Sequence, residues 1–243
     1  MELSEPRTEL MSSLKELLVS GSFSDLTILC GPNEHKVHKA VICPRSEFFN
    51  AACRFGKEAE TGIITLSDDD PETVRLMIEY FYTLEYSPLC SDIVVQTPVN
   101  VPNPADSDSE FIPDDWGRRK DRRPKPHPKS TKPTGPSHFT TFAKLYAIAD
   151  KYNIKGLQTL SQRKFKLTAE SYWNHDDLPS AIHTVYTSTP DTNMGLRNIV
   201  VNLIADRMSL LRKPEMEALM REFNGLAFDL LKLKYINDGG LWS

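Results

Sequence analysis

Two histidines and two cysteines lie close enough in the sequence to be considered as metal ligands. His35 and His38 alternate with Val37, and Cys43 and Cys53 follow. Imidazole nitrogens and thiolates suit zinc, but structural zinc sites use paired ligands at short, recurring spacings. These residues match no such spacing, so we expect neither a metal site nor any other cofactor.

Two acidic clusters, at residues 68–70 and 175–177, supply carboxylates of the kind that acid–base catalysis uses. Neither has a nucleophile or an oxyanion donor beside it in the sequence. Each precedes an expected helix, where aspartate stabilises exposed backbone amides. The chain also lacks the G-x-S-x-G, P-loop, G-x-G-x-x-G and H-E-x-x-H motifs. We therefore interpret both clusters as helix caps and expect a protein that is not an enzyme.

A basic run is the sharpest short motif in the chain. It consists of Arg118, Arg119, Lys120, Arg122 and Arg123. Such a run is typical of nuclear localisation signals and of nucleic-acid contacts. The alternative is a solvated run that keeps an extended loop soluble and that neighbouring acidic residues mask. The formal net charge of −4 argues against a general nucleic-acid binder and against a membrane-surface protein.

The composition is that of an ordinary soluble protein, with 40% hydrophobic and 26% charged residues among 243. At roughly 100–200 residues per domain, the length fits one domain with an extension or two small domains. The four cysteines form no disulfide framework, and no stretch approaches the roughly 18 apolar residues of a membrane span. Three glutamates near the start, and no continuous apolar run there, argue against a secretory signal. We expect an intracellular protein of the cytoplasm, the nucleus or both.

A helix over residues 9–19 is expected to come first. Its apolar positions fall at i, i+4, i+7 and i+8 on one face and are Leu10, Leu14, Leu17 and Leu18. Gly21 ends it.

A dense α/β segment follows. The pattern predicts strands at 25–30, 35–38 and 62–66, with a turn at 31–34. Ser46 is a candidate N-cap for a helix over 47–55, and Asp70 followed by Pro71 predicts the start of a long helix.

Prolines and charges then interrupt the pattern at about residues 87–137. This polar stretch is too poor in apolar residues to offset the entropy of ordering, so we interpret it as a disordered insertion. The remaining chain predicts helices, with apolar faces at 142–152 and 157–167. Later helices are expected at about 178–187, 196–211 and 214–233. In the last of these, Phe228 and Leu231 are expected among the apolar contacts.

The order of these elements and their residues resemble the BTB/POZ domain family. The resemblance rests on five motifs: Ser-Asp-Leu-Thr-Ile at 24–28, His-Lys-Val-His-Lys-Ala-Val-Ile-Cys at 35–43, Ser-x-Phe-Phe at 46–49, the stretch 64–72, and Met-Ile-Glu-Tyr-Phe-Tyr-Thr at 77–83. It resumes at 145–154, Leu-Tyr-Ala-Ile-Ala-Asp-Lys-Tyr-Asn-Ile. The resemblance is to short fungal members, and it implies an α+β fold, a small, mainly three-stranded sheet flanked by helices. It places the domain at 1–170, interrupted by the insertion. It places a helical extension at 171–243, for which a reduced BACK-like region is a candidate.

The family resemblance also implies self-association. In the family the first helix packs across a two-fold axis, so Leu10, Leu14, Leu17 and Leu18 are the expected homodimer interface. The alternative is that this helix covers its own core. Asp25 and Lys39 match positions that line a charged pocket near the dimer groove. The reading we prefer for them is a structural ion pair in which Asp25 also caps backbone amides.

Many BTB proteins are adaptors that dock a cullin scaffold through a hydrophobic–x–Glu motif. Here Phe55 and Glu58 are the candidate cullin-facing residues, but Gly56 occupies the hydrophobic position. The leading hypothesis is a dimerising interaction protein that scaffolds other proteins. A cullin-based ubiquitin ligase adaptor and a nuclear transcriptional cofactor are the alternatives.

Overall fold

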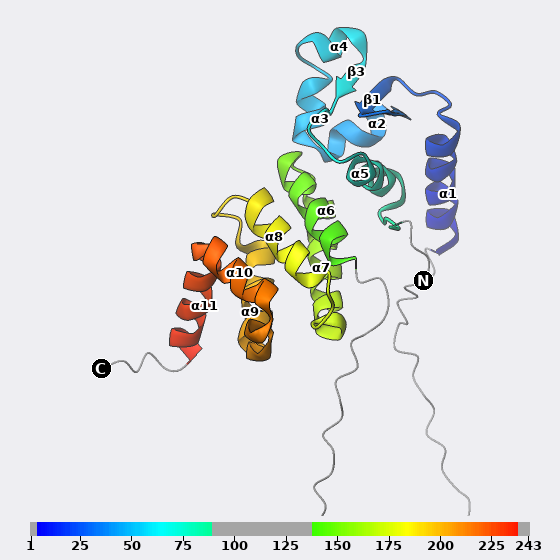
Figure 1. Cartoon of the computed structure of the whole chain (residues 1–243). Coiled ribbons are helices and arrows are strands. Elements are labelled where there is room, and N and C mark those ends of the chain that lie inside the picture. Colours follow the sequence, from blue (N-terminus) through cyan, green and yellow to red (C-terminus); the bar gives the residue numbers. More distant parts are fainter. Residues whose placement is uncertain (1–3, 89–137, 238–243) are drawn as a thin grey trace, which may run out of the picture. The chain divides into compact units, whose positions relative to one another are not determined.

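The computed structural model describes residues 4–88 and 138–237, and these group into one compact unit (Figure 1). The predicted insertion at 87–137, including the basic run, lies almost wholly outside the described residues. A three-stranded sheet flanked by helices comes first and a helical region follows. This confirms the predicted α+β class.

The sheet has the strand order β2-β1-β3, with β1 (Leu26–Cys30) in the middle. β1 runs antiparallel to β2 (Asn33–Val37) and parallel to β3 (Ile63–Thr65). Successive side chains on a strand point to opposite faces, and in β1 the buried ones are Leu26, Ile28 and Cys30. The first strand therefore anchors the sheet to the helical core.

The second strand differs from the prediction in its bounds. β2 starts at Asn33 rather than at His35, because Asn33 pairs with Cys30 and only Gly31 and Pro32 remain for the turn. Gly31 has a φ of +54°, a left-handed conformation that glycine adopts at little cost. His38, expected to end this strand, instead precedes helix α2 (Lys39–Ile42) as its N-cap residue.

The helices between β2 and β3 are shorter than the sequence predicted. A 3₁₀ turn, η1 (Cys43–Arg45), connects α2 to α3 (Glu47–Ala52). The predicted helix over 47–55 was too long, because the chain leaves α3 at Cys53 and reaches Gly56 in a left-handed conformation. A short helix that the sequence pattern did not predict, α4 (Lys57–Thr61), follows.

Helix α5 (Pro71–Thr83) begins as predicted. The Asp70 side chain accepts a hydrogen bond from the backbone N–H of Thr73, and Pro71 occupies the first turn. Leu84 ends the helix with a φ of +58°. Helix α1 (Ser4–Ser20), which starts earlier than the predicted residue 9, packs against α5.

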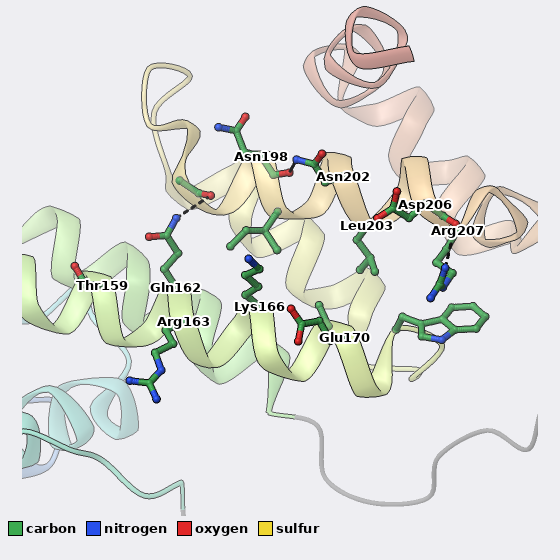
Figure 2. Close-up of a pocket in the computed structure, with 14 residues that line it drawn as sticks. Thr159, Gln162, Arg163, Lys166, Glu170, Asn198, Asn202, Leu203, Asp206 and Arg207 are labelled. Carbon is green, nitrogen blue, oxygen red and sulfur yellow. Dashed lines mark hydrogen bonds between the residues drawn. The ribbon is translucent and has the colours of Figure 1, made fainter. Parts of the chain in front are cut away.

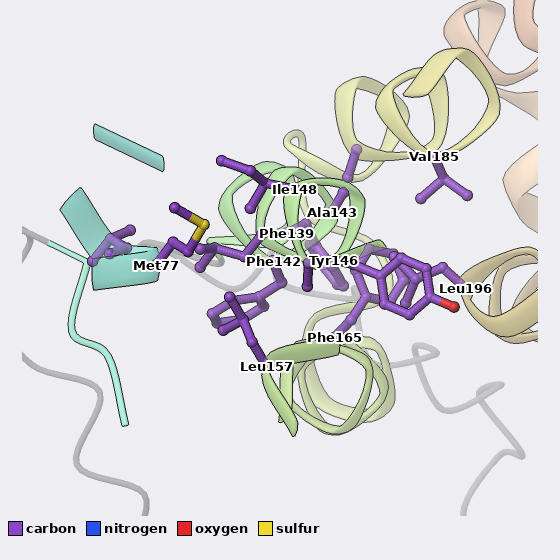
Figure 3. Packing of buried hydrophobic residues seen from close by; sticks show 14 of the residues in the cluster. Met77, Phe139, Phe142, Ala143, Tyr146, Ile148, Leu157, Phe165, Val185 and Leu196 are labelled. Carbon is purple, nitrogen blue, oxygen red and sulfur yellow. The ribbon is translucent and has the colours of Figure 1, made fainter. Parts of the chain in front are cut away.

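Helix α6 (Phe139–Lys151) is the centre of the helical core. It packs against α5, α7 (Lys155–Tyr172) and α8 (Leu178–Ser188). Figure 3 shows Phe139 and Phe142 of α6 among Met77, Leu157 and Phe165, all buried. The residues that follow the insertion therefore share a core with those that precede it.

Polar contacts also join the two described stretches. The Lys151 ammonium group lies 2.9 Å from the Asp69 carboxylate, whose other contact is the Tyr152 hydroxyl. The Lys164 ammonium group donates to the backbone carbonyl of Tyr86 at 3.1 Å.

The C-terminal helices correct two predictions. The helix expected at 196–211 is split into α9 (Met194–Asp206) and a 3₁₀ turn, η2 (Met208–Arg212), because Arg207 leaves the helical conformation at φ −128°. The helix expected at 214–233 is α10 (Pro214–Glu222) followed by α11 (Asn224–Asn237), with a break at Phe223. The break turns Phe228 and Leu231 to solvent at 64% and 68% exposure, so their predicted apolar contacts were wrong.

Candidate protein-interaction surfaces

The turn between α1 and β1 presents an aromatic side chain to solvent. Phe23 is 89% exposed and has a φ of +62°, which is rare for a bulky residue. Local bonds hold this turn: Gly21 N–H donates to Leu17 O at 3.0 Å, and Ser24 N–H donates to Gly21 O at 3.3 Å. An uncommon backbone conformation persists only where its surroundings fix it, and such positions often carry function.

A buried network connects this turn to the rest of the domain. His38 Nε2 lies 2.7 Å from the Ser22 carbonyl, and His38 Nδ1 lies 2.8 Å from the Tyr82 hydroxyl. The Tyr82 oxygen also accepts from the His38 backbone N–H at 2.9 Å. Burial raises the pKa of Tyr82 to about 12, so its hydroxyl stays protonated. The Ser22 carbonyl can only accept, so His38 Nε2 donates the hydrogen bond to it.

The predicted dimer residues of α1 differ in their surroundings. Leu14 and Leu18 are partly buried and pack against the domain's own core. Leu17 is half-buried, whereas Leu10 is 59% exposed. Val19, at the end of the same helix, is 80% exposed. The helix therefore covers its own core with one part of its apolar surface and leaves another part uncovered.

The predicted charged pair lies at the surface, close to this turn. Asp25 is exposed and Lys39 half-buried. Asp25 Oδ1 accepts a hydrogen bond from the Lys39 backbone N–H at 2.8 Å. Within the described residues no ion pair joins the two side chains, so the structural ion pair that we preferred is absent there, while the amide-capping contact is present.

The candidate cullin-facing residues flank a glycine with a demanding conformation. Phe55 is 72% exposed and Glu58 is in the first turn of α4. Gly56 between them has a φ of +81°, and an added Cβ would come within 3.1 Å of Glu58 Oε2. A larger apolar residue at Gly56 would be strained there.

A groove between α7 and α9 is a feature that the sequence pattern did not reveal (Figure 2). It has a volume of about 610 Å³. Its apolar lining includes Ile199, Leu203 and Trp173. Arg163 and Lys166 on α7 also line it, and Figure 2 shows the Lys166 side chain pointing toward α9. The lining comes from two separate helices, and only their packing shows that these faces meet.

Several polar side chains of this groove are held by local contacts. Gln162 donates to the Gly195 carbonyl at 3.2 Å and Asn202 to the Asn198 carbonyl at 2.6 Å. The Arg207 guanidinium lies 5.6 Å from the Trp173 ring centre. None of the lining residues is a histidine or a cysteine, so the groove lacks the most common general base and nucleophile.

The two histidines considered for metal binding have different surroundings. His35 is half-buried on β2 rather than in an exposed hairpin, and its Nε2 has no hydrogen-bond partner. Both ring nitrogens of His38 form hydrogen bonds, one with Ser22 and one with Tyr82. In the described ranges, no three His, Cys, Asp or Glu side chains gather closely enough to hold a metal ion. Over the same ranges, every helix is too short or too polar to cross a membrane.

The basic run, Arg118, Arg119, Lys120, Arg122 and Arg123, lies outside the described residues. The structure therefore says nothing about its surroundings.

Comparison with known proteins agrees with this architecture. The sequence profile of the BTB/POZ domain matches residues 14–96. The chain is 32% identical to TD and POZ domain-containing protein 5 of Mus musculus over 82 residues, 33% of this chain and 24% of that protein. It is 34% identical to Kelch-like protein 40 of Homo sapiens over 80 residues, 32% of this chain and 13% of that protein.

The chain thus spans about a quarter or less of the length of these curated relatives. Residues 14–96, which include the three-stranded sheet and its flanking helices, are therefore similar to the BTB/POZ domain.

Proposed function

We propose that this chain is a non-enzymatic, intracellular interaction protein that forms a homodimer and scaffolds other proteins. The observation that carries the dimer is Phe23, an aromatic side chain 89% exposed on a turn that hydrogen bonds fix. Leu10 and Val19 on α1 add exposed apolar surface. Large aromatic side chains on a fixed backbone are typical anchors of interfaces, because little freedom is lost on binding.

In this proposal the apolar residues of α1 and the following turn have two different roles. Leu14 and Leu18 hold the helix on its own domain, while Leu10 and Phe23 contact the partner copy. Leu17, which is half-buried, lies between the two roles. A two-fold arrangement would let each copy cover the same surface of the other and would close the assembly at two chains.

A paired substitution tests this assignment. The double variant Leu10→Asp/Phe23→Asp changes only exposed positions, so it should unfold in urea at the wild-type midpoint. Its dimer dissociation constant by sedimentation equilibrium should rise at least about tenfold, or about 1.4 kcal/mol. Leu231→Asp, on the exposed face of α11, is the matched control and should leave dissociation unchanged. If only the control weakens self-association, the interface lies elsewhere.

The charged pocket belongs to the same proposal. Asp25 and Lys39 would border the partner groove, with the Asp25 carboxylate capping the Lys39 amide. Asp25→Ala separates the readings: a merely structural role predicts a lower free energy of unfolding with an unchanged dimer. A role at the interface predicts weaker dimerisation beyond that loss of stability.

An adaptor for a cullin scaffold is the second candidate function. The exposed Phe55 beside Glu58 favours it. The strained geometry required of any apolar residue at Gly56 weighs against it. Purified chain mixed with a cullin at micromolar concentration decides the matter: co-elution supports the adaptor, and its absence removes it.

Two finer assignments complete the proposal. The domain would occupy residues 1–170 around the insertion, with residues 171–243 as a helical extension of BACK-like type. The basic run would act in nuclear targeting if the protein is a transcriptional cofactor. Deleting residues 118–123 with no change in cellular location would remove that reading.

A further inference from the structure

Two cysteines, Cys43 and Cys53, both contact the Phe49 carbonyl of α3. Cys43 begins η1, and Cys53 is the C-cap residue of α3. Cys43 Sγ lies 3.6 Å from the Phe49 carbonyl oxygen, and the Cys53 backbone N–H donates to that same oxygen at 3.0 Å. Both cysteines therefore contact the same carbonyl oxygen, although ten positions separate them in the chain.

This pair differs from Cys30, the third cysteine that the structure describes. Cys30 is fully buried in β1, and its thiol donates to the Asp69 carbonyl at 3.3 Å. Cys43 and Cys53 are only half-buried, so a small reagent can reach them. Their elements, η1 and α3, already pack against each other. A disulfide needs two β-carbons in close approach, and both cysteines contact the one Phe49 carbonyl oxygen.

We propose that Cys43 and Cys53 are a modification site, at which hydrogen peroxide closes an intrachain disulfide that a thiol reductant reopens. In the first step the Cys53 sulfur attacks a peroxide oxygen. The O–O bond breaks, one water leaves, and Cys53 becomes a sulfenic acid. In the second step the Cys43 sulfur attacks the Cys53 sulfur, and the S–O bond breaks. The departing hydroxide takes the Cys43 proton and leaves as a second water. The two sulfurs are oxidised by two electrons in all, and the peroxide is reduced by two.

The groups around Cys43 favour Cys53 as the cysteine that is oxidised first. Burial raises the pKa of Cys43 to about 12, and the contact with Cys53 contributes. Lys39 opposes this effect and Asp25 adds to it. A thiol held protonated is a poor first nucleophile toward peroxide. It is nevertheless well placed to attack a sulfenic acid next to it.

The test uses the full chain treated with a low excess of hydrogen peroxide, blocked with N-ethylmaleimide and digested without reduction. We expect one linked pair of peptides, containing Cys43 and Cys53, that separates on treatment with dithiothreitol. Cys43→Ser should trap the sulfenic acid on Cys53, which dimedone detects. Cys53→Ser should leave Cys43 reduced under the same conditions.

Cys90→Ser is the matched control, because Cys90 lies outside the described residues, and it should leave the bond intact. The wild-type mapping needs no variant, so a folding defect in either serine variant does not affect it. Maleimide on both Cys43 and Cys53 after peroxide treatment would overturn the proposal. So would a bond from either of them to Cys90 or to a second chain.

Discussion

The hydroxyl of Ser46 donates a hydrogen bond of 2.6 Å to the backbone carbonyl of Tyr152, 106 positions later in the chain. The same oxygen accepts from the Phe49 backbone N–H at 3.3 Å, which caps α3. One buried side chain therefore starts a helix before the insertion and bonds to the end of a helix after it. This contact joins the two described stretches of the domain.

Removing that hydroxyl should be costly. Ser46→Ala leaves the Tyr152 carbonyl and the Phe49 amide without this hydrogen-bond partner. A buried polar group that loses its partner destabilises the folded state. We expect the free energy of unfolding in urea to fall by about 1–3 kcal/mol. Ser67→Ala, at an exposed position, is the control and should change it by less than about 0.5 kcal/mol. Equal effects of the two substitutions would refute the role given to Ser46.

The close approach of α5 and α7 gives a second prediction. Gly156, in the first turn of α7, has no room for a Cβ, because the Tyr80 hydroxyl of α5 occupies that space. Glycine to alanine in a helix normally stabilises by up to about 1 kcal/mol. Gly156→Ala should instead destabilise by about 1–3 kcal/mol, as overpacking does.

Gly225 provides the matched control for that substitution. It lies in the first turn of α11 with nothing within 4 Å of an added Cβ. Gly225→Ala should therefore raise the thermal midpoint while Gly156→Ala lowers it. A higher midpoint for both variants would mean that α7 does not approach Tyr80 so closely.

The capping aspartate of α5 should contribute in a pH-dependent way. Burial alone would raise the pKa of Asp70, but hydrogen bonds from Thr73 and the nearby Lys144 outweigh it and hold that pKa below its ordinary value. The stabilisation is therefore present above the unfolded pKa, about 3.9, and is lost as pH falls through the lower folded value. Asp70→Ala should cost about 1 kcal/mol at neutral pH.

Urea unfolding at several pH values checks this, with Asp68→Ala as the exposed control in the same turn. The difference between wild type and Asp70→Ala should shrink below about pH 4. A difference that stays constant into strong acid would show that the ionised carboxylate is not the capping group.

His35 should reduce stability in mildly acidic solution. Burial lowers the pKa of His35 below its ordinary value, and the charge of Arg75 adds to this effect. The unfolded chain, with a pKa near about 6.5, then binds the proton more readily than the folded one. Stability is therefore lost as pH falls below about 6.5 toward the folded pKa.

His35→Gln removes this titration. Its free energy of unfolding should fall less than that of the wild type between about pH 7 and pH 5, while above about pH 7.5 the two curves should run parallel. Identical pH slopes at all values would contradict the assignment to His35.

Local signals in the sequence predicted much of the fold. The first strand, the Ser46 cap and the Asp70–Pro71 helix start depend on residues within a few positions of one another, and all three appear as expected. Element ends were less accurate, because they depend on distant partners. The break at Phe223, for example, lies inside the single helix predicted over 214–233.

The candidate surfaces were harder to predict for the same reason. The conformation of Phe23 depends on a turn that His38 holds through Ser22, 16 positions away. The groove between α7 and α9 needs Lys166 and Leu203 side by side, and neither position is distinctive alone. Gly56 is visible in the sequence as a glycine, but its positive φ is known only from the backbone of the structure.

The central claim is that this protein self-associates through the surface around Leu10 and Phe23. Light scattering coupled to size-exclusion chromatography measures it most directly on the full chain, at tens of micromolar. We predict a wild-type mass of twice the 27.6 kDa chain and a mass near that of one chain for Leu10→Asp/Phe23→Asp. A wild-type protein that elutes at the mass of one chain across this range would contradict the account.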